Sequence, residues 1–166
     1  MRARKLAFGG LLAGLALVAY VIESYLPPPL PLLPMARIGV ANVFVLWALY
    51  AMGLREAAAA MGCKALLGPL LAGTPFGVVY ALAGAALSLP AMMIATKTKL
   101  RPVTAGAIGG ALHPVGQVLC AALLMRTPGV MAMLPWLFVM GAVSGAAGGI
   151  LVGGLQSRMK SRGRGV

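Results

Sequence analysis

Six long apolar windows occupy almost the whole chain and restrict the folds it can adopt. A helix that crosses the hydrocarbon of a bilayer needs about 20 mostly apolar residues. The windows are separated by proline, glycine or basic clusters, which leaves little sequence for a soluble domain. They lie at about residues 6–26, 36–53, 57–73, 75–95, 104–124 and 130–154. We therefore predict an all-α, polytopic membrane protein, a six-helix bundle forming a single integral membrane domain over residues 1–166.

The composition agrees with this prediction. Hydrophobic residues make up 61% of the chain and charged residues 10%, and the mean hydropathy is +0.96. A water-soluble surface cannot be assembled from so few charged residues. We expect the lipid bilayer to surround most of the protein.

The scarcity of carboxylates argues against an enzyme. Glu23 and Glu56 are the two acidic residues of the chain, and there is no aspartate. Diphosphate chemistry with Mg²⁺ usually depends on clustered aspartates, and a hydrolase with paired carboxylates needs both in one site. A metal site formed by His113, Cys120 and Cys63 is only weakly specified by their spacing. We predict no catalytic residues, no cofactor and no metal.

The basic residues predict the orientation. The formal charge is +12, but most Lys and Arg residues flank the apolar windows, which argues for membrane topology and against nucleic-acid binding. Arg37 and Arg126 fall on one side and Lys64 at membrane depth. The other side has Arg2, Arg4, Lys5, Arg55, Lys97, Lys99, Arg101, Arg158, Lys160, Arg162 and Arg164. This excess predicts a multi-pass protein of the cell membrane with both termini in the cytoplasm.

Three connecting or terminal segments have distinct compositions. The proline-rich stretch 27–34 cannot continue a helix, so we expect a stiff connection on the far side of the membrane. The third window contains the interruption "LLGPLLAGTP", which is typical of a broken or tilted helix. Residues 155–166 are expected to form a flexible, basic cytoplasmic tail near anionic headgroups.

Polar residues inside the apolar windows are the candidate site. His113, Gln117 and Cys120 share one helical face, which should look into the bundle or a wet cavity because exposing it to lipid is costly. The second and fourth windows also place a polar group beside glycines, and Lys64 adds a charge. Such groups in an apolar lining are typical of small-molecule pockets. The predicted ligand-binding residues are Asn42, Lys64, Ser88, His113 and Gln117.

Each of these residues also has a purely structural interpretation. Asn42, Gln117 and His113 can serve as hydrogen bonds between helices. Lys64 can extend its side chain to the cytoplasmic surface, or pair with Glu56 or Glu23. The sequence leaves these alternatives open.

Small residues repeat on two helices. A glycine every four residues leaves a smooth stripe along which another helix can approach closely. In the last window this stripe indicates either packing inside the chain or docking of a partner subunit. The candidate interface residues are Gly9, Gly10, Ala13 and Gly14 in the first window and Gly141, Gly145, Gly149 and Gly153 in the last.

Several stretches resemble one family, the small bacterial membrane proteins called Gx transporters, also named heptaprenyl diphosphate synthase component I. The resemblance covers most of the chain, and its segments match in order and spacing. These segments are "ESYLPPPLPLLPMARIGVANVFVLWALYAMGLREA", "YALAGAALSLPAMM", "GALHPVGQVLCAALL" and "LPWLFVMGAVSGAAGGILVG".

The family in turn resembles the S components of energy-coupling-factor (ECF) importers, six-helix proteins that bind a vitamin-like molecule and work with a coupling subunit and ATPases. The resemblance implies that Gly9, Gly10, Ala13 and Gly14 face the coupling subunit. It also implies polar binding positions at Asn42, Lys64, His113 and Gln117. The family commonly has arginine at the position of Lys64; lysine keeps the charge without the bidentate fork, which leaves a preference for phosphate or carboxylate open.

We therefore expect the substrate-binding membrane subunit of an importer for a small, vitamin-like or isoprenoid-related metabolite. ATP hydrolysis would come from partners, because the chain has no phosphate-binding loop of the G-x-x-x-x-G-K-[ST] type. The alternative is a non-catalytic accessory subunit of a prenyl diphosphate, quinone-synthesis or electron-transfer complex. The name of the family does not imply catalysis here. The enzymes that elongate prenyl chains are expected to use aspartate-rich Mg²⁺ sites, and this chain has no aspartate.

Overall fold

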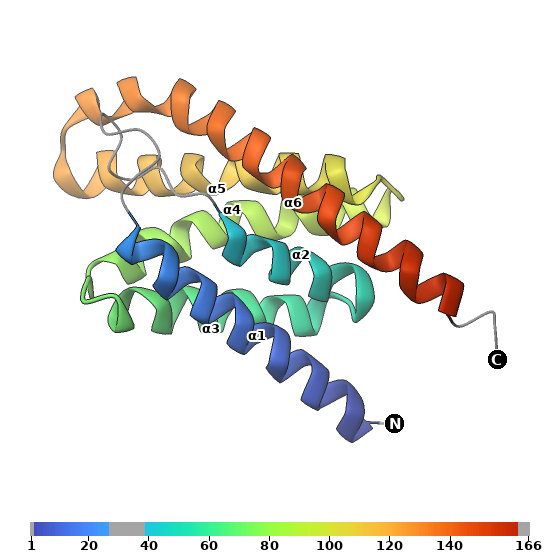
Figure 1. Ribbon diagram of the computed structural model, residues 1–166. Helices are drawn as coiled ribbons and strands as arrows, with labels where there is room; N and C mark the ends of the chain where they lie inside the picture. The colour runs from blue at the N-terminus through green and yellow to red at the C-terminus, as the bar shows by residue number, and fades with distance from the viewer. Residues whose placement is uncertain (1, 27–38, 163–166) are drawn as a thin grey trace.

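The computed structural model describes residues 2–26 and 39–162, and this part of the chain is helical with short connections (Figure 1). The elements are α1 (Arg2–Tyr25), α2 (Val40–Ala51), α3 (Leu54–Leu71), α4 (Gly77–Lys97), α5 (Pro102–Met125), the 3₁₀ helix η1 (Pro128–Met133) and α6 (Leu134–Arg162). The predicted all-α, polytopic membrane fold is confirmed. The predicted connection 27–34 and Arg37 lie outside the described residues.

Four segments of the described chain are long and apolar enough to cross a membrane. They are Ala3–Tyr25, Gly77–Lys97, Pro102–Met125 and Pro128–Met159. The helices α2 and α3, which fall in the second and third predicted windows, are not among these four segments. The helix α2 has 12 residues, which at 1.5 Å per residue is about 18 Å and shorter than the hydrocarbon layer. It begins at Val40, directly after Gly39, which has a left-handed backbone (φ 79°).

Two further expectations about helix limits are corrected. The third window is not broken, because α3 is one helix of 18 residues with Pro69 near its end, and the alternative of a tilted helix stays a prediction. The tail is not flexible from residue 155, because α6 continues to Arg162. The residues Gln156 to Lys160 favour helix, and the next glycine is Gly163.

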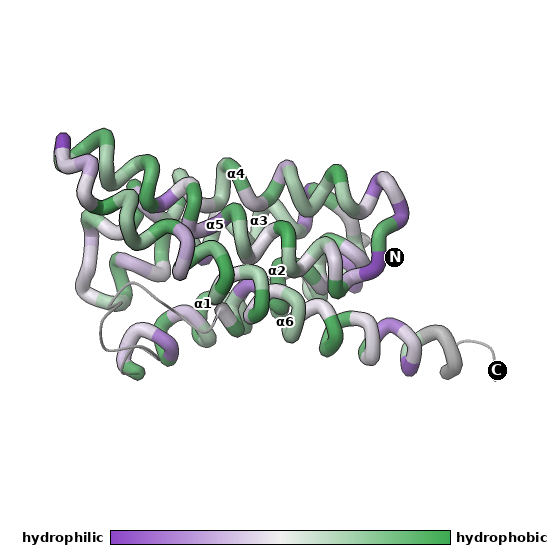
Figure 2. Tube along the Cα trace, turned by 90° about the horizontal axis from the view of Figure 1, so that it is seen from above, coloured by the Kyte–Doolittle hydropathy of each residue, from purple (hydrophilic) through white to green (hydrophobic). Residues whose placement is uncertain are grey.

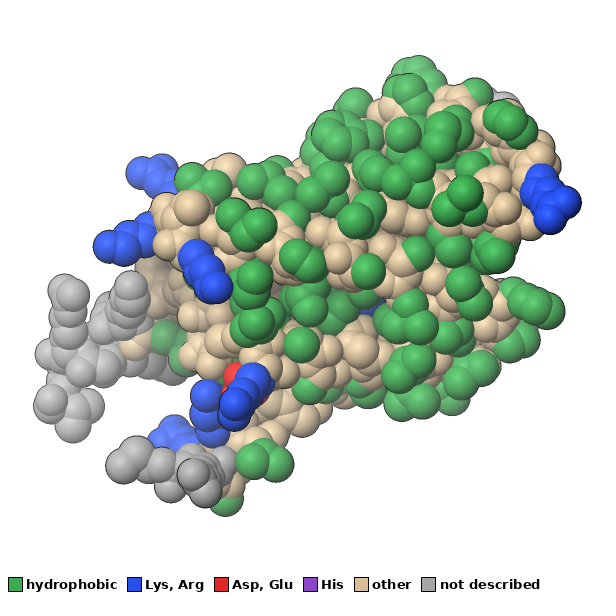
Figure 3. Space-filling view, turned by 180° about the vertical axis from the view of Figure 1, so that it is seen from behind, with side chains coloured by type: hydrophobic (Ala, Val, Ile, Leu, Met, Phe, Trp, Pro, Cys, Tyr) green, Lys and Arg blue, Asp and Glu red, His purple; other side chains and the backbone are tan. Residues whose placement is uncertain are grey.

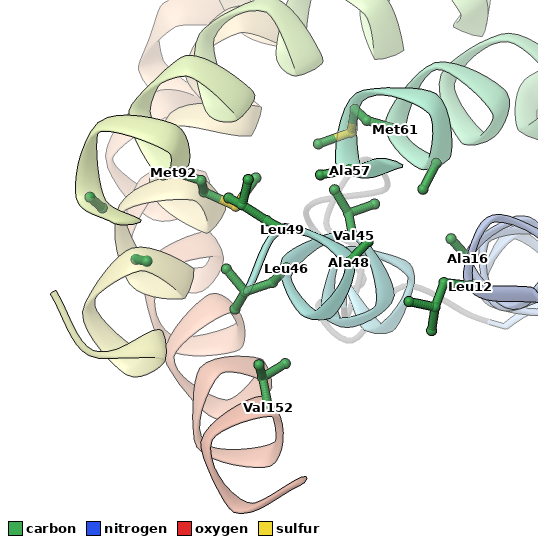
Figure 4. Packing of buried hydrophobic residues seen from close by; sticks show 13 residues of the cluster. Leu12, Ala16, Val45, Leu46, Ala48, Leu49, Ala57, Met61, Met92 and Val152 are labelled. Atoms are coloured by element: carbon green, nitrogen blue, oxygen red, sulfur yellow. The ribbon is translucent and has the colours of Figure 1, made fainter. Parts of the chain in front are cut away.

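The short helix α2 lies at the centre of the bundle. Figure 4 shows its side chains pointing towards α1, α3, α4 and α6. The core cluster contains Val45, Leu46, Ala48 and Leu49 of α2, together with residues such as Leu12 of α1, which is fully buried. A helix that is apolar on all sides is one that its neighbours surround. This position brings α2 into contact with every other α-helix.

The outer surface of the bundle is apolar. Leu11, Leu67, Ile94, Leu123 and Ile150 are all exposed, as expected for side chains that face lipid. Hydrophilic residues concentrate at the helix ends (Figure 2). Lys and Arg side chains gather at the end where both termini lie, with hydrophobic side chains between that end and the other (Figures 1 and 3).

The glycine stripe of α6 packs against α5 inside the chain. A Cβ added to Gly145 would lie 2.0 Å from the carbonyl oxygen of Gly106, and one added to Gly141 would lie 2.1 Å from that of Gly110. Gly149 meets Pro102 at 2.3 Å. The interpretation as a docking surface for a partner is therefore wrong for Gly141, Gly145 and Gly149, because α5 already occupies them. We call this contact the α5–α6 seam.

The other small-residue candidates are divided between packing and exposure. A Cβ at Gly9 would meet Met52 and Glu56, so Gly9 serves contacts inside the bundle, and Ala13 is half-buried against the core. Nothing lies within 4 Å of a Cβ at Gly10, Gly14 or Gly153. These three positions remain accessible to a partner helix.

Candidate ligand-binding cavity

A cavity of about 210 Å³ lies among the helices, and residues from all six α-helices line it. The five residues predicted from the sequence come from four different helices and share this one lining. They are Asn42 of α2, Lys64 of α3, Ser88 of α4, and His113 and Gln117 of α5. The structure therefore brings the whole predicted set together, and a role in ligand binding stays a prediction.

Lys64 is a charged residue near the middle of α3. It is 3% exposed, although it belongs to a membrane helix, and its Nζ donates a hydrogen bond to Oδ1 of Asn42. Its side chain does not extend to the surface of the bundle, which rules out one of the structural interpretations. The ammonium group instead forms part of the cavity wall.

Ser88 and His113 form the second polar pair. The Ser88 hydroxyl lies 3.2 Å from Nδ1 of His113, and Ser88 is 1% exposed. The imidazole fits there because α4 has Gly84 one turn earlier, where an added Cβ would lie 2.9 Å from the ring. The backbones of α4 and α5 also approach closely at Gly116, where a Cβ would lie 2.3 Å from the carbonyl oxygen of Ala83.

Glu23 belongs to the cavity although the prediction did not include it among the site residues. It is 9% exposed, and its Oε1 accepts a hydrogen bond of 2.6 Å from the backbone N–H of Val40. A signal was available, since a carboxylate near the end of a membrane helix is rare and usually functional. Glu56, in contrast, pairs with Lys5 at 3.0 Å and is not part of the lining. The two carboxylates therefore do not form one site.

Further polar groups and apolar side chains complete the lining. The hydroxyl-bearing residues Tyr20, Thr74, Tyr80 and Ser144 contribute to it. Apolar surface comes from Leu46, Met92, Leu137 and Met140, and glycines of the seam contribute backbone. A few hydrogen-bonding groups set into apolar walls can orient a small molecule with one polar end.

The cysteines take no part in this lining. Neither Cys63 nor Cys120 is among the cavity residues, and both are free thiols. Within residues 2–26 and 39–162, no three His, Cys, Asp or Glu side chains lie close enough to hold a metal ion. Cys120 therefore shares the helical face of His113 and Gln117 but lies outside the cavity lining.

Comparison with known proteins gives one match. The family model for heptaprenyl diphosphate synthase component I matches residues 12–155, which includes every predicted ligand-binding residue. No match was found among the curated proteins or among the solved structures. The match covers most of the 166 residues, so the chain belongs to the heptaprenyl diphosphate synthase component I family.

Proposed function

We propose that this protein is a membrane subunit that binds a small anionic or amphipathic metabolite for import, in the manner of an ECF S component. One observation carries the proposal: five polar residues predicted from the sequence, on four helices, line the same cavity. Residues that only join neighbouring helices have no reason to converge in this way. The bound molecule would be vitamin-like or related to isoprenoids.

The polar pairs support a ligand with an anionic end. The Lys64 side chain is buried in the cavity lining, and its ammonium group donates a hydrogen bond to Asn42. Hydrogen bonds from an ammonium to an anionic oxygen are among the stronger ones in proteins. Met92, Leu137 and Met140 would cover the apolar part of the molecule.

The proposal includes no catalysis by this chain. Glu23 receives the N–H of Val40 and Glu56 pairs with Lys5, so neither is arranged with the other as an acid and base. Movement of the ligand across the membrane would depend on a coupling subunit and ATPases. The exposed positions Gly10 and Gly14 of α1 are the proposed contact with the coupling subunit.

We also propose an orientation in the cell membrane with both termini in the cytoplasm. Arg4, Lys5, Arg55, Arg101 and Arg158 flank helix ends on the side of the termini, while Arg126 follows the opposite end of α5. Basic residues favour the cytoplasmic side. Attachment of a protease-cleavable tag to either terminus and digestion of sealed vesicles would test this orientation.

A second candidate function follows from the family match. The family is described as a component of heptaprenyl diphosphate synthase, which favours a non-catalytic accessory subunit of a prenyl diphosphate synthesis complex. In that case the polar residues of the cavity would stabilise the bundle, and partner subunits would bind on the exposed helix faces.

Native mass spectrometry of the protein extracted in mild detergent from its own membrane separates the two candidates. The import proposal predicts a bound small molecule that is lost from the Lys64→Ala and His113→Ala variants and retained by Glu56→Ala, the matched control outside the cavity. Retention by both cavity variants would overturn the assignment of this site. An empty protein that carries a stoichiometric prenyl-synthesis subunit would favour the accessory role.

A further inference from the structure

The first turn of α2 depends on a side chain from another helix. The N-cap residue, Gly39, has a left-handed backbone and makes no side-chain hydrogen bond to the helix. The first N–H groups of any helix lack partners within it. Oε1 of Glu23, near the end of α1, accepts the N–H of Val40, the first residue of α2. Glu23 thus supplies the cap that α2 lacks, and its carboxylate lies at the positive end of the helix dipole.

The same turn holds the lysine of the cavity. Asn42 follows Val40 by two residues, and its backbone N–H donates to the carbonyl of Gly39 over 3.0 Å. The side chain of Asn42 accepts the hydrogen bond of Lys64. A continuous set of contacts therefore leads from Glu23 through the start of α2 to the ammonium group.

The turn is also held from the side of α6. A Cβ added to Gly39 would lie 2.8 Å from the hydroxyl oxygen of Ser144, so the chain passes α6 with no room to spare. Glu23, Gly39, Asn42, Lys64 and Ser144 all line the cavity. The start of α2 is thus part of the cavity wall, fixed between α1 and α6.

We infer that Glu23 is a positioning residue of the cavity: its carboxylate holds the first turn of α2, and through Asn42 this turn places the Lys64 ammonium. The consequence for a ligand rests on the proposed function. The positioning itself requires no ligand. The hydrogen-bond acceptor of Glu23 is the essential feature, so an uncharged acceptor of the same length should replace it.

The reactivity of Lys64 measures this positioning directly. The protein in mild detergent is treated briefly with acetic anhydride, and the acetylation of each lysine is read by mass spectrometry. Lys64 is 3% exposed and should react slowly, whereas the exposed Lys97 serves as the internal reference. The variants are Glu23→Ala, Glu23→Gln and Glu23→Asp, with Glu56→Ala as the matched loss of the other carboxylate.

Loss of a helix cap predicts that Glu23→Ala raises the acetylation of Lys64 relative to Lys97 about fivefold. Glu23→Gln should stay close to wild type, because its amide oxygen can accept the same N–H, and Glu56→Ala should not differ from wild type. Wild-type reactivity of Lys64 in Glu23→Ala overturns the inference. Equal reactivity in Glu23→Gln and Glu23→Ala also overturns it, because the charge and not the acceptor would then be essential.

If Glu23→Ala does not fold, Glu23→Asp decides the question, since it keeps the charge but shortens the reach. If Lys64 is acetylated faster in Glu23→Asp than in Glu23→Gln, the result supports positioning by Glu23. If Lys64 in Glu23→Asp is acetylated at the wild-type rate, the result contradicts it. The ligand is tested separately by mass spectrometry of the same variants. Absence of a bound molecule from wild type would remove the proposed function and leave the lysine result standing.

Discussion

The α5–α6 seam and the cavity beside it both use glycine, but for different purposes. At the seam, Gly106 and Gly110 of α5 meet Gly141 and Gly145 of α6, so backbone packs directly on backbone. Beside the cavity, Gly84 of α4 packs against His113 instead, where an added Cβ would lie 2.8 Å from the carbonyl oxygen and 2.9 Å from the ring. A glycine that meets another glycine therefore allows two helices to pack closely. A glycine that meets a polar side chain makes room for that side chain.

This difference predicts that the two regions respond differently to mutation. Changes at the seam should lower the stability of the bundle, because no atom there can move aside. Changes in the cavity should affect ligand retention more than stability, because the cavity has free volume. The following variants test this contrast, starting with the largest expected effect.

Gly145→Val should be the most damaging change. Its Cβ would lie 2.0 Å from the carbonyl oxygen of Gly106, so the two helices would have to separate, at a cost of about 3 kcal/mol or more. Thermal unfolding in detergent, followed by circular dichroism, measures the loss. Gly153→Val is the control two turns further along the same helix, where nothing lies within 4 Å. Equal stability of the two variants would contradict the seam.

Lys64→Met should separate binding from stability. Replacement of a buried charged side chain by an apolar one of similar volume removes the cost of keeping the charge out of water, so the unfolding free energy should stay near the wild-type value or rise. Retention of the bound molecule should fall about tenfold or more, since the charge-assisted hydrogen bond is lost. The two readouts are melting temperature and occupancy by native mass spectrometry. A large drop in melting temperature with unchanged occupancy would make Lys64 a structural residue.

Ser88→Ala should have a smaller effect. It removes the hydroxyl that lies 3.2 Å from the His113 ring, a loss of about 1 kcal/mol. A double-mutant cycle with His113→Phe measures whether the two residues act together in ligand retention. The effects of the two substitutions should not add, because both break the same contact. Additive effects would show that the hydroxyl and the imidazole act independently.

Gly10→Val should have the smallest effect on the isolated protein. Nothing lies within 4 Å of the added Cβ, so the melting temperature should not differ from wild type. Co-purification with a coupling subunit should decrease if this face of α1 is the contact. Gly9→Val, which meets Met52 and Glu56, is the neighbouring control that should reduce stability instead. Unchanged co-purification by Gly10→Val would remove α1 as the proposed interface.

Helical spacing predicted some of the residues that line the cavity but not all of them. His113 and Gln117 were found because residues four apart share a face of one helix. Glu23 was not, because its partner is the backbone N–H of Val40 on another helix. This hydrogen bond depends on how α1 and α2 pack against each other. The residue pattern of neither helix predicts that packing.

Hydropathy and periodicity are local properties that can be read from the sequence alone. They predicted that the chain is an all-α membrane protein, where its long helices lie and which face of α5 is polar. Only the tertiary structure decided that the short α2 lies at the centre, that the glycines of α6 face α5, and that Lys64 bonds to Asn42. The physical reason is that a helix determines the direction in which a side chain points, whereas the group it meets depends on the packing of the other helices.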